Sequence, residues 1–175
     1  MERNIYDALH DIPTVTELCV LALYAQANTH PYMCQIQGPG TENVNMLELG
    51  PLHNTLQEHI QNVIDNPDLF LPPTCNWITG AMDGKEWECT EVITAILKKS
   101  QELPHLKPLL VAYLEGAGVT WKRFTTEFAP GGVISLTSAE NWKKAWMPPT
   151  NDVNEGALGS YFGKSQKHQC TCIML

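Results

Sequence analysis

The first helical pattern along the chain begins just after Pro13. Thr14 and Glu17 have the spacing of a capping box, in which a hydroxyl and a glutamate satisfy the free N–H groups of a helix start. Apolar residues then occupy most of the helix circumference: Val15, Leu18, Cys19, Leu21, Ala22, Leu23 and Ala25. The pattern predicts a buried helix of roughly four turns, ended by Pro31.

Two further segments carry apolar residues at the three- and four-residue steps that are typical of a helix. One begins at Pro51 and ends at Pro67, and its apolar positions are Leu52, Leu56, Ile60, Val63 and Ile64. The other begins at Thr90 and closes with Lys98 and Lys99, whose charge suits a helix C-terminus. Both segments are predicted helices.

The longest apolar stripe runs from Leu106 to Phe128 and predicts a helix that ends before Pro130. Gly116 and Gly118 lie in its middle. Each weakens a helix by roughly 1 kcal/mol relative to alanine. They therefore imply either a kink or a close contact with another helix.

A short helix is predicted beyond this stripe, because Thr137 and Glu140 repeat the capping-box spacing. It is expected to run through Trp146 and to end at the proline pair 148–149. The tryptophans expected to anchor the core are Trp121, Trp142 and Trp146.

The middle of the chain, residues 67–89, has no helical period. Asp83 and Gly84 could form the turn of a small hairpin near residues 77–88, and a structured loop fits the same sequence. Few other segments alternate with period two. The prediction is therefore a mainly α protein: a single irregular helical domain over residues 1–162, with a loop-rich middle, and a flexible C-terminal tail over residues 163–175.

Composition narrows the classes of partner and compartment. Eleven Lys and Arg against nineteen Asp and Glu give a formal charge of −8, which disfavours direct nucleic-acid binding because that depends on cations. The N-terminus lacks a signal pattern, and the most apolar segment is too short to span a bilayer, so an intracellular location is expected. The cysteines are then expected to be mostly free thiols, with Cys19 a small core residue.

Capping and carboxylate residues concentrate between Thr150 and Glu155. Thr150, Asn151 or Asp152 can cap a last helix that runs toward Tyr161, with Glu155 in its first turn. Asp152 and Glu155 are also candidate metal ligands, because hard divalent cations favour carboxylate oxygens. Capping alone explains the residue types.

The same segment, TNDVNE, is similar to the T-N-N-x-x-E segment that precedes the last catalytic carboxylate in several groups of DDE transposases, including Mutator-like ones. Asp152 departs from the second asparagine of that pattern. In those enzymes the glutamate and two aspartates on a β-sheet hold two divalent metals for phosphodiester cleavage. The resemblance implies a vestigial catalytic role for Glu155, with Mg²⁺ or Mn²⁺ as cofactor only if the transposase interpretation holds.

A broader series of segments resembles an uncharacterised family that is expanded in mushroom-forming fungi and derived from mobile elements. The series covers nearly all of residues 11–161 and includes LYAQANTHPYM, GPGTENVNMLELGPLH and AWMPPTNDVNEGALGSY. After Tyr161 the chain continues as FGKSQKHQCTCIML, where the family usually continues with an arginine-containing helix. The departure suggests truncation or a changed reading frame.

A DDE site needs two aspartates beside Glu155, and no run of buried strands is visible in the sequence to carry them. Asp65, Asp68 and Asp83 lie in turn-like sequence, where capping and turn roles are usual. The helical part resembles what such enzymes insert between the sheet and the glutamate-bearing helix. The chain is therefore expected to be catalytically silent.

Histidine and cysteine pairs add little to this picture. His53 and His59 are six residues apart, so they do not share a helix face as the two histidines of an HExxH site do. His30 and Cys34 are four apart, but Pro31 is expected to prevent a regular helix across them. Ordinary polar positions explain all four.

The last four residues, Cys172 to Leu175, fit a prenylation signal of the geranylgeranyl type. Cys170 could carry a second acyl chain, which stable membrane anchoring requires. So short a match also arises by accident, which is the favoured explanation. Lipidation of Cys172 is therefore an alternative, and membrane binding is expected only with it.

The leading hypothesis is a non-enzymatic, transposon-derived remnant whose surviving role is interaction with an unidentified protein partner. One alternative is a prenylated peripheral membrane protein. Another is the helical part of a DDE transposase or nuclease that takes its aspartates from another segment. If strands that once covered the helices are missing, apolar faces should remain exposed.

Overall fold

A computed structural model describes residues 2–72, 75–142 and 144–150. Within these ranges the regular secondary structure is helical, with no β-strand, which confirms the predicted mainly α fold. The helices are α1 (Glu2–His10), α2 (Ile12–Tyr24), a π-helical turn (Ala25–Thr29), α3 (His30–Gln37), α4 (Gly50–Asp65), α5 (Trp77–Gly80), α6 (Thr90–Lys99), α7 (Leu106–Phe124) and α8 (Ala139–Trp142). Short 3₁₀ turns lie at Met46–Glu48, Pro67–Leu69 and Ser100–Glu102. None of the described helices combines the length and the apolar character needed to cross a membrane.

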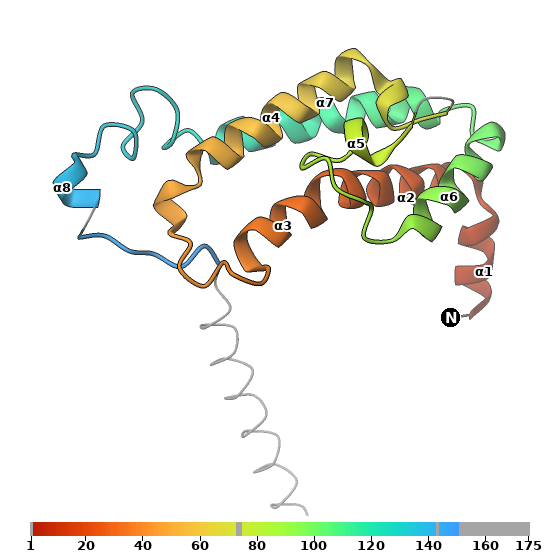
Figure 1. Ribbon diagram of the computed structural model, residues 1–175. Helices are drawn as coiled ribbons and strands as arrows, with labels where there is room; N and C mark the ends of the chain where they lie inside the picture. The colour runs from red at the N-terminus through yellow and green to blue at the C-terminus, as the bar shows by residue number, and fades with distance from the viewer. Residues whose placement is uncertain (1, 73–74, 143, 151–175) are drawn as a thin grey trace, which may run out of the picture.

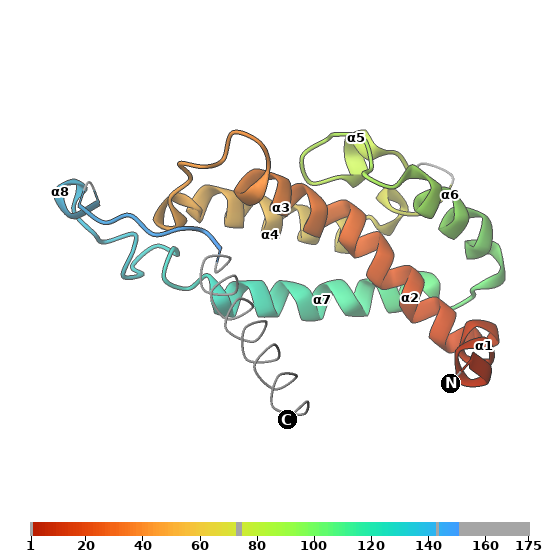
Figure 2. The same ribbon diagram turned by 90° about the horizontal axis from the view of Figure 1, so that it is seen from below.

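α2, the π-helical turn and α3 together form one long rod (Figure 1). α7 packs mainly against α4 and also along α2. α6 also packs against α2. α1 turns away from the rod at one end of the molecule (Figure 2).

The core lies between α2, α4 and α7 and uses the predicted apolar positions. Leu56, Ile60 and Val63 of α4 and Leu110 and Leu114 of α7 belong to one buried cluster, each at most 1% exposed. Full burial of such a side chain is worth about 2 kcal/mol. The apolar stripes of α4 and α7 therefore account for the close pairing of these two helices.

The two glycines of α7 have different surroundings. A Cβ at Gly118 would lie 3.6 Å from Cγ2 of Ile60, so Gly118 makes the predicted close contact with another helix. A Cβ at Gly116 would meet no atom within 4 Å. α7 itself is continuous from Leu106 to Phe124.

The start of α2 differs from the predicted capping box. Asp11, not Thr14, is the N-cap: its carboxylate accepts hydrogen bonds from the N–H of Thr14 at 3.0 Å and from the Thr14 hydroxyl at 2.6 Å. These bonds lower the pKa of Asp11. With the cap at Asp11, Pro13 lies in the first turn, where its missing N–H has no helical partner to lose.

The prediction that Pro31 ends the helix is wrong, because a π-helical turn carries the chain past it. A proline inside an α-helix clashes with the carbonyl four residues earlier, which here belongs to Ala27. In the wider turn the N–H of His30 instead bonds the carbonyl of Ala25. The Ala27 carbonyl accepts a hydrogen bond from the N–H of Met82, at 2.9 Å. The helix then continues to Gln37.

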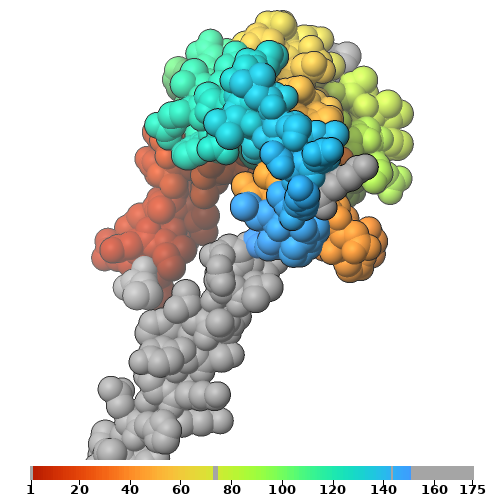
Figure 3. Space-filling model, turned by 90° about the vertical axis from the view of Figure 1, so that its left-hand side faces the viewer, coloured from red at the N-terminus to blue at the C-terminus, as the bar shows by residue number. Residues whose placement is uncertain are grey.

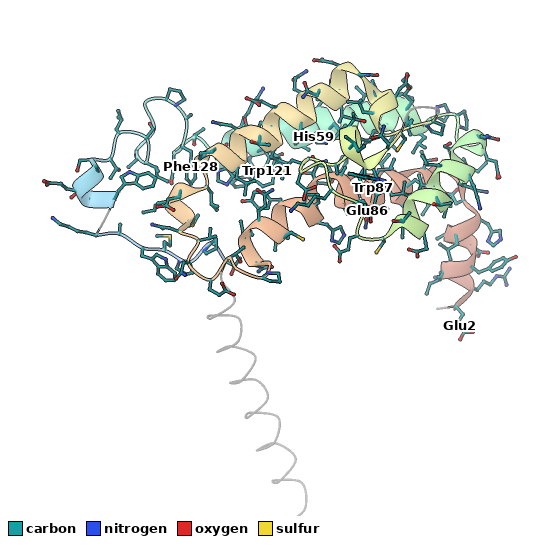
Figure 4. The ribbon with its side chains drawn as sticks, in the orientation of Figure 1. Glu2, His59, Glu86, Trp87, Trp121 and Phe128 are labelled. Atoms are coloured by element: carbon teal, nitrogen blue, oxygen red, sulfur yellow. The ribbon has the colours of Figure 1, made fainter. Side chains whose placement is uncertain are left out.

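The middle of the chain forms a structured loop and not the hairpin near residues 77–88. The four-residue helix α5 is capped by Asn76, whose side chain accepts from the N–H of Thr79. Gly84 adopts a positive φ of 65° at the following turn, which suits glycine. Trp87 is 9% exposed and belongs to the core cluster, so this loop is packed on the helices (Figure 4).

The last described segment also departs from prediction. Ser138 caps α8, which ends at Trp142 and not at Trp146. Trp146 is 62% exposed, so it is not the core anchor that was expected. Chain 144–150 instead runs along residues 45–46, where Met46 donates its N–H to the carbonyl of Met147 at 2.8 Å (Figure 3). The predicted domain boundary at residue 162 lies outside the described residues.

Candidate functional site

The π-helical turn places side chains of the rod against two different parts of the molecule. Tyr24 and Tyr32, on either side of the turn, contact Trp121 of α7. Gln26 and His30 contact the loop that precedes α6. The turn therefore lies between an aromatic cluster and a polar pocket, each of which is a candidate site.

The aromatic cluster consists of Tyr24, Tyr32, His53, Trp121 and Phe128. The indole Nε1–H of Trp121 donates to the Tyr24 hydroxyl at 2.8 Å. Its ring lies 5.2 Å from that of Tyr32 and 6.0 Å from that of His53, centroid to centroid. Phe128 meets the His53 ring edge-on at 4.6 Å. Trp121 and Phe128 can be followed on and beyond the C-terminal half of α7 (Figure 4).

His53 is the polar centre of this cluster, and the expectation of an ordinary polar position for it is wrong. It is 6% exposed, its Nε2 is hydrogen-bonded to the Tyr32 hydroxyl at 3.1 Å, and its Nδ1 is buried without a hydrogen-bond partner. Burial lowers the pKa of His53, because the charged imidazolium would lose its hydration. Both polar side-chain atoms of Asn28, on the π-helical turn, are likewise buried and unpartnered. Such groups cost stability.

The polar pocket has a volume of about 270 Å³ and opens between the rod and the loop before α6. Its lining comprises Gln26, His30, Pro31, Cys34, Asp83, Lys85, Glu86 and Glu88. The imidazole Nδ1 of His30 contacts the Glu88 carboxylate, and the buried Gln26 accepts the N–H of Cys89 through Oε1 at 2.9 Å. Among the described residues, no three His, Cys, Asp or Glu side chains are arranged to hold a metal ion.

No specific role was predicted for the pair His30 and Cys34 or for the pair His53 and His59, but the structure places the first pair at the polar pocket and both residues of the second in contact with other helices. His30 and Cys34 line the polar pocket together, because the helix continues past Pro31. His59 donates its ring N–H to the Gly80 carbonyl at 3.1 Å and so ties α4 to α5 (Figure 4). Burial lowers the pKa of His59, while that hydrogen bond acts in the opposite direction.

An apolar groove lies between α2 and α7, with a volume of about 460 Å³. Small residues of α7, Ala112, Gly116, Ala117 and Thr120, line it together with three aromatic side chains, Tyr24, Tyr113 and Trp121. Tyr24 and Tyr113 meet edge to face, with ring centroids 5.2 Å apart. No carboxylate, ammonium or guanidinium group of the described residues lines this groove.

Apolar side chains are exposed on α1 and α2. Leu18 and Leu21, one turn apart on α2, are 47% and 48% exposed, although this helix was expected to be buried. α1 has no buried residue, and its Ile5 and Leu9 are 55% and 57% exposed. The N-terminal helices therefore present apolar surface to solvent.

The residues predicted from the asparagine-rich segment and the C-terminus are not placed. Glu155, Asp152 and Cys172 all lie outside the described residues. The other aspartates considered are engaged within the chain. Asp65 accepts from Gln61, Asp68 pairs with Lys107 at 2.8 Å, and Asp83 accepts the N–H of Lys85.

Comparison of the chain with protein-family models, with curated proteins and with solved structures found no match.

Proposed function

We propose that this protein is a non-enzymatic protein-interaction module, the helical remnant of a transposon-derived protein. The observation that carries the proposal is the exposed apolar surface of α1 and α2, in particular Leu18 and Leu21. We infer the transposon origin of the protein from the resemblance of the sequence to the fungal mobile-element family.

The pattern of α2 supports an interaction role. A helix that is apolar around its whole circumference is normally buried on all sides. Here Cys19, Val20 and Leu23 face the core, while Leu18 and Leu21 remain about half exposed. A partner that covers the outer face would remove this apolar surface from water, at about 25 cal/mol for each Å² buried.

The environment of the aspartates supports a non-catalytic role for the described part. Two-metal catalysis needs carboxylates that converge on a shared pair of cations. Asp68 is instead engaged by the ammonium group of Lys107, and Asp83 by Lys85, so each serves the fold locally. The contact of Asp83 with the N–H of Lys85 agrees with the turn role expected from the sequence, whereas Asp68 forms an ion pair with a distant helix, which was not predicted.

The test replaces both exposed leucines, Leu18→Glu with Leu21→Glu, and compares the result with Val133→Glu plus Leu136→Glu. The control residues are 76% and 74% exposed but lie in the segment after α7. We expect both double variants to fold, with midpoints of thermal unfolding close to that of the wild type. The α2 variant should lose more of the fluorescence of an apolar dye than the control variant does.

A photo-crosslinker at position 18 of the otherwise wild-type chain gives the second readout. An interaction surface should yield one discrete adduct. Excess unlabelled wild type should compete with formation of this adduct, and the α2 double variant should not. Unfolding of the α2 variant alone would show that the chain itself covers this face. In that case the proposal fails.

A further inference from the structure

Gly116 lowers the stability of α7, and no contact within the fold requires a glycine at this position. Glycine inside a helix lowers stability relative to alanine, because it orders a freer backbone and contributes no side chain. At Gly118 the neighbouring Ile60 explains the glycine, but a Cβ at Gly116 would meet no atom within 4 Å. Gly116 instead lines the apolar groove, where the absence of a side chain lets another backbone approach.

The chain contains an element that fits this groove, its own helix α1. Ile5 and Leu9 lie one turn apart on one side of α1, and each is more than half exposed, although Leu9 also lines a pocket with Val15 and Leu103 of its own chain. Arg3 and Asp7 lie on the opposite side of α1 and would stay in water, while Glu2 lies three residues before Ile5 on the same side, at the N-terminal end of the helix. At a rise of 1.5 Å per residue, α1 is about 13.5 Å long and the groove-lining part of α7, from Ala112 to Trp121, is about 15 Å long.

α1 is held away from the groove of its own molecule. A single residue, Asp11, joins α1 to α2. The N–H of Asp11 donates a hydrogen bond to the carbonyl of Ala8 in α1, and its carboxylate accepts hydrogen bonds from Thr14 in α2. The connection is therefore fixed to both helices. α1 projects from the end of the bundle at which α2 begins (Figure 1, Figure 2). The groove of a second molecule is therefore the one that α1 can reach.

We propose that the partner is a second copy of this chain, with α1 of each molecule seated in the groove between α2 and α7 of the other. A two-fold axis makes both contacts identical, which closes the assembly as a dimer. This inference rests on the proposed interaction function and names the partner for the α1 part of the exposed surface; Leu18 and Leu21 do not line the groove. Because each molecule carries a charge of −8, the dimer should tighten as added salt screens the repulsion.

The test uses the full chain in sedimentation experiments over a range of concentrations, with Gly116→Met and Ile5→Glu as variants. Methionine fills the groove but suits a helix, so the midpoint of thermal unfolding of Gly116→Met should be unchanged or higher. Its dimer dissociation constant should rise at least about ten-fold, as should that of Ile5→Glu. The control Val133→Glu, at an exposed residue outside both elements, should dimerise as the wild type does.

Mixing the two variants separates this arrangement from non-specific association. The Gly116→Met molecule keeps an intact α1, and the Ile5→Glu molecule keeps an intact groove, so the mixture should recover part of the lost association. A mixture no better than either variant alone would overturn the reciprocal dimer. A wild type that stays monomeric, while the apolar dye still binds α2, would also overturn it and would leave the interaction function standing.

Discussion

The backbone N–H of Met82 donates a hydrogen bond to the carbonyl oxygen of Ala27, across two segments that are far apart in the sequence. The carbonyl is available because Pro31, four residues after Ala27, has no N–H to offer it. The π-helical turn and the loop before α6 are therefore one structural feature. Pro31 leaves the Ala27 carbonyl without its α-helical donor, and this carbonyl is the attachment point for the loop.

Replacement of Pro31 by alanine should loosen this attachment. The substituted residue would bring a new N–H donor to the position from which an α-helix bonds the Ala27 carbonyl, and this donor would compete with Met82. We expect hydrogen exchange at the Met82 amide to become about ten-fold faster. Pro13→Ala is the matched control, because Pro13 lies in the first turn of α2. Unchanged exchange in Pro31→Ala would show that the loop is held by other contacts.

Burial of His53 should make stability depend on pH. Because burial lowers the pKa of His53 in the folded protein, the unfolded chain binds the proton more tightly. The free energy of unfolding should therefore be highest above pH 6.5, the ordinary value for histidine, and should decrease as the pH falls below it. His59 contributes in the same direction.

The measurement is urea unfolding of the wild type and of His53→Gln between pH 8 and pH 5. Glutamine stays neutral, so the variant should show a shallower loss of stability toward low pH. Asn54→Gln, at an exposed and non-titrating position of the same helix, should keep the slope of the wild type. Equal slopes in all three proteins would contradict the assignment to His53.

The hydrogen bond between Trp121 and Tyr24 should be worth about 1 kcal/mol, the usual net value for such a bond. The test is a double-mutant cycle in which Trp121→Phe, Tyr24→Phe and the combined variant are unfolded in urea. We expect the combined loss to be smaller than the sum of the single losses by about that amount. Trp146→Phe, at a tryptophan that is 62% exposed, should cost little. Strict additivity would show that the two side chains are energetically independent.

Much of the fold follows from local periodicity. α4, α6 and most of α7 were predicted from apolar residues at helical steps, because burial of one face is encoded in the sequence around each helix. The π-helical turn was not predicted, since it depends on an acceptor that is satisfied by a distant loop. Trp146 was misplaced for a similar reason: whether a large apolar residue is buried depends on the path of the chain around it.

The aromatic cluster left a signal in the sequence that was not used. His53 occupies the same helical stripe as Leu56, Ile60 and Val63, so a polar ring was placed on a buried face. Asn28 lies four residues from both Tyr24 and Tyr32. A polar side chain on an apolar stripe indicates a buried polar group, but its partner comes from another helix and cannot be named from the spacing.

Two contacts in the polar pocket, Gln26 with Cys89 and His30 with Glu88, should contribute different amounts to the stability of the fold. Gln26 is 5% exposed, and Gln26→Leu would leave the N–H of Cys89 without its acceptor, at a cost of about 1–3 kcal/mol. The side chains of His30 and Glu88 are 38% and 57% exposed, and exposed ion pairs contribute at most about 1 kcal/mol, so His30→Gln should change stability little. Thermal unfolding of the two variants measures the difference. Equal losses of stability in the two variants would mean that the contact of His30 with Glu88 holds the loop as firmly as the buried glutamine does. Solvent would then screen this contact less than its exposure implies.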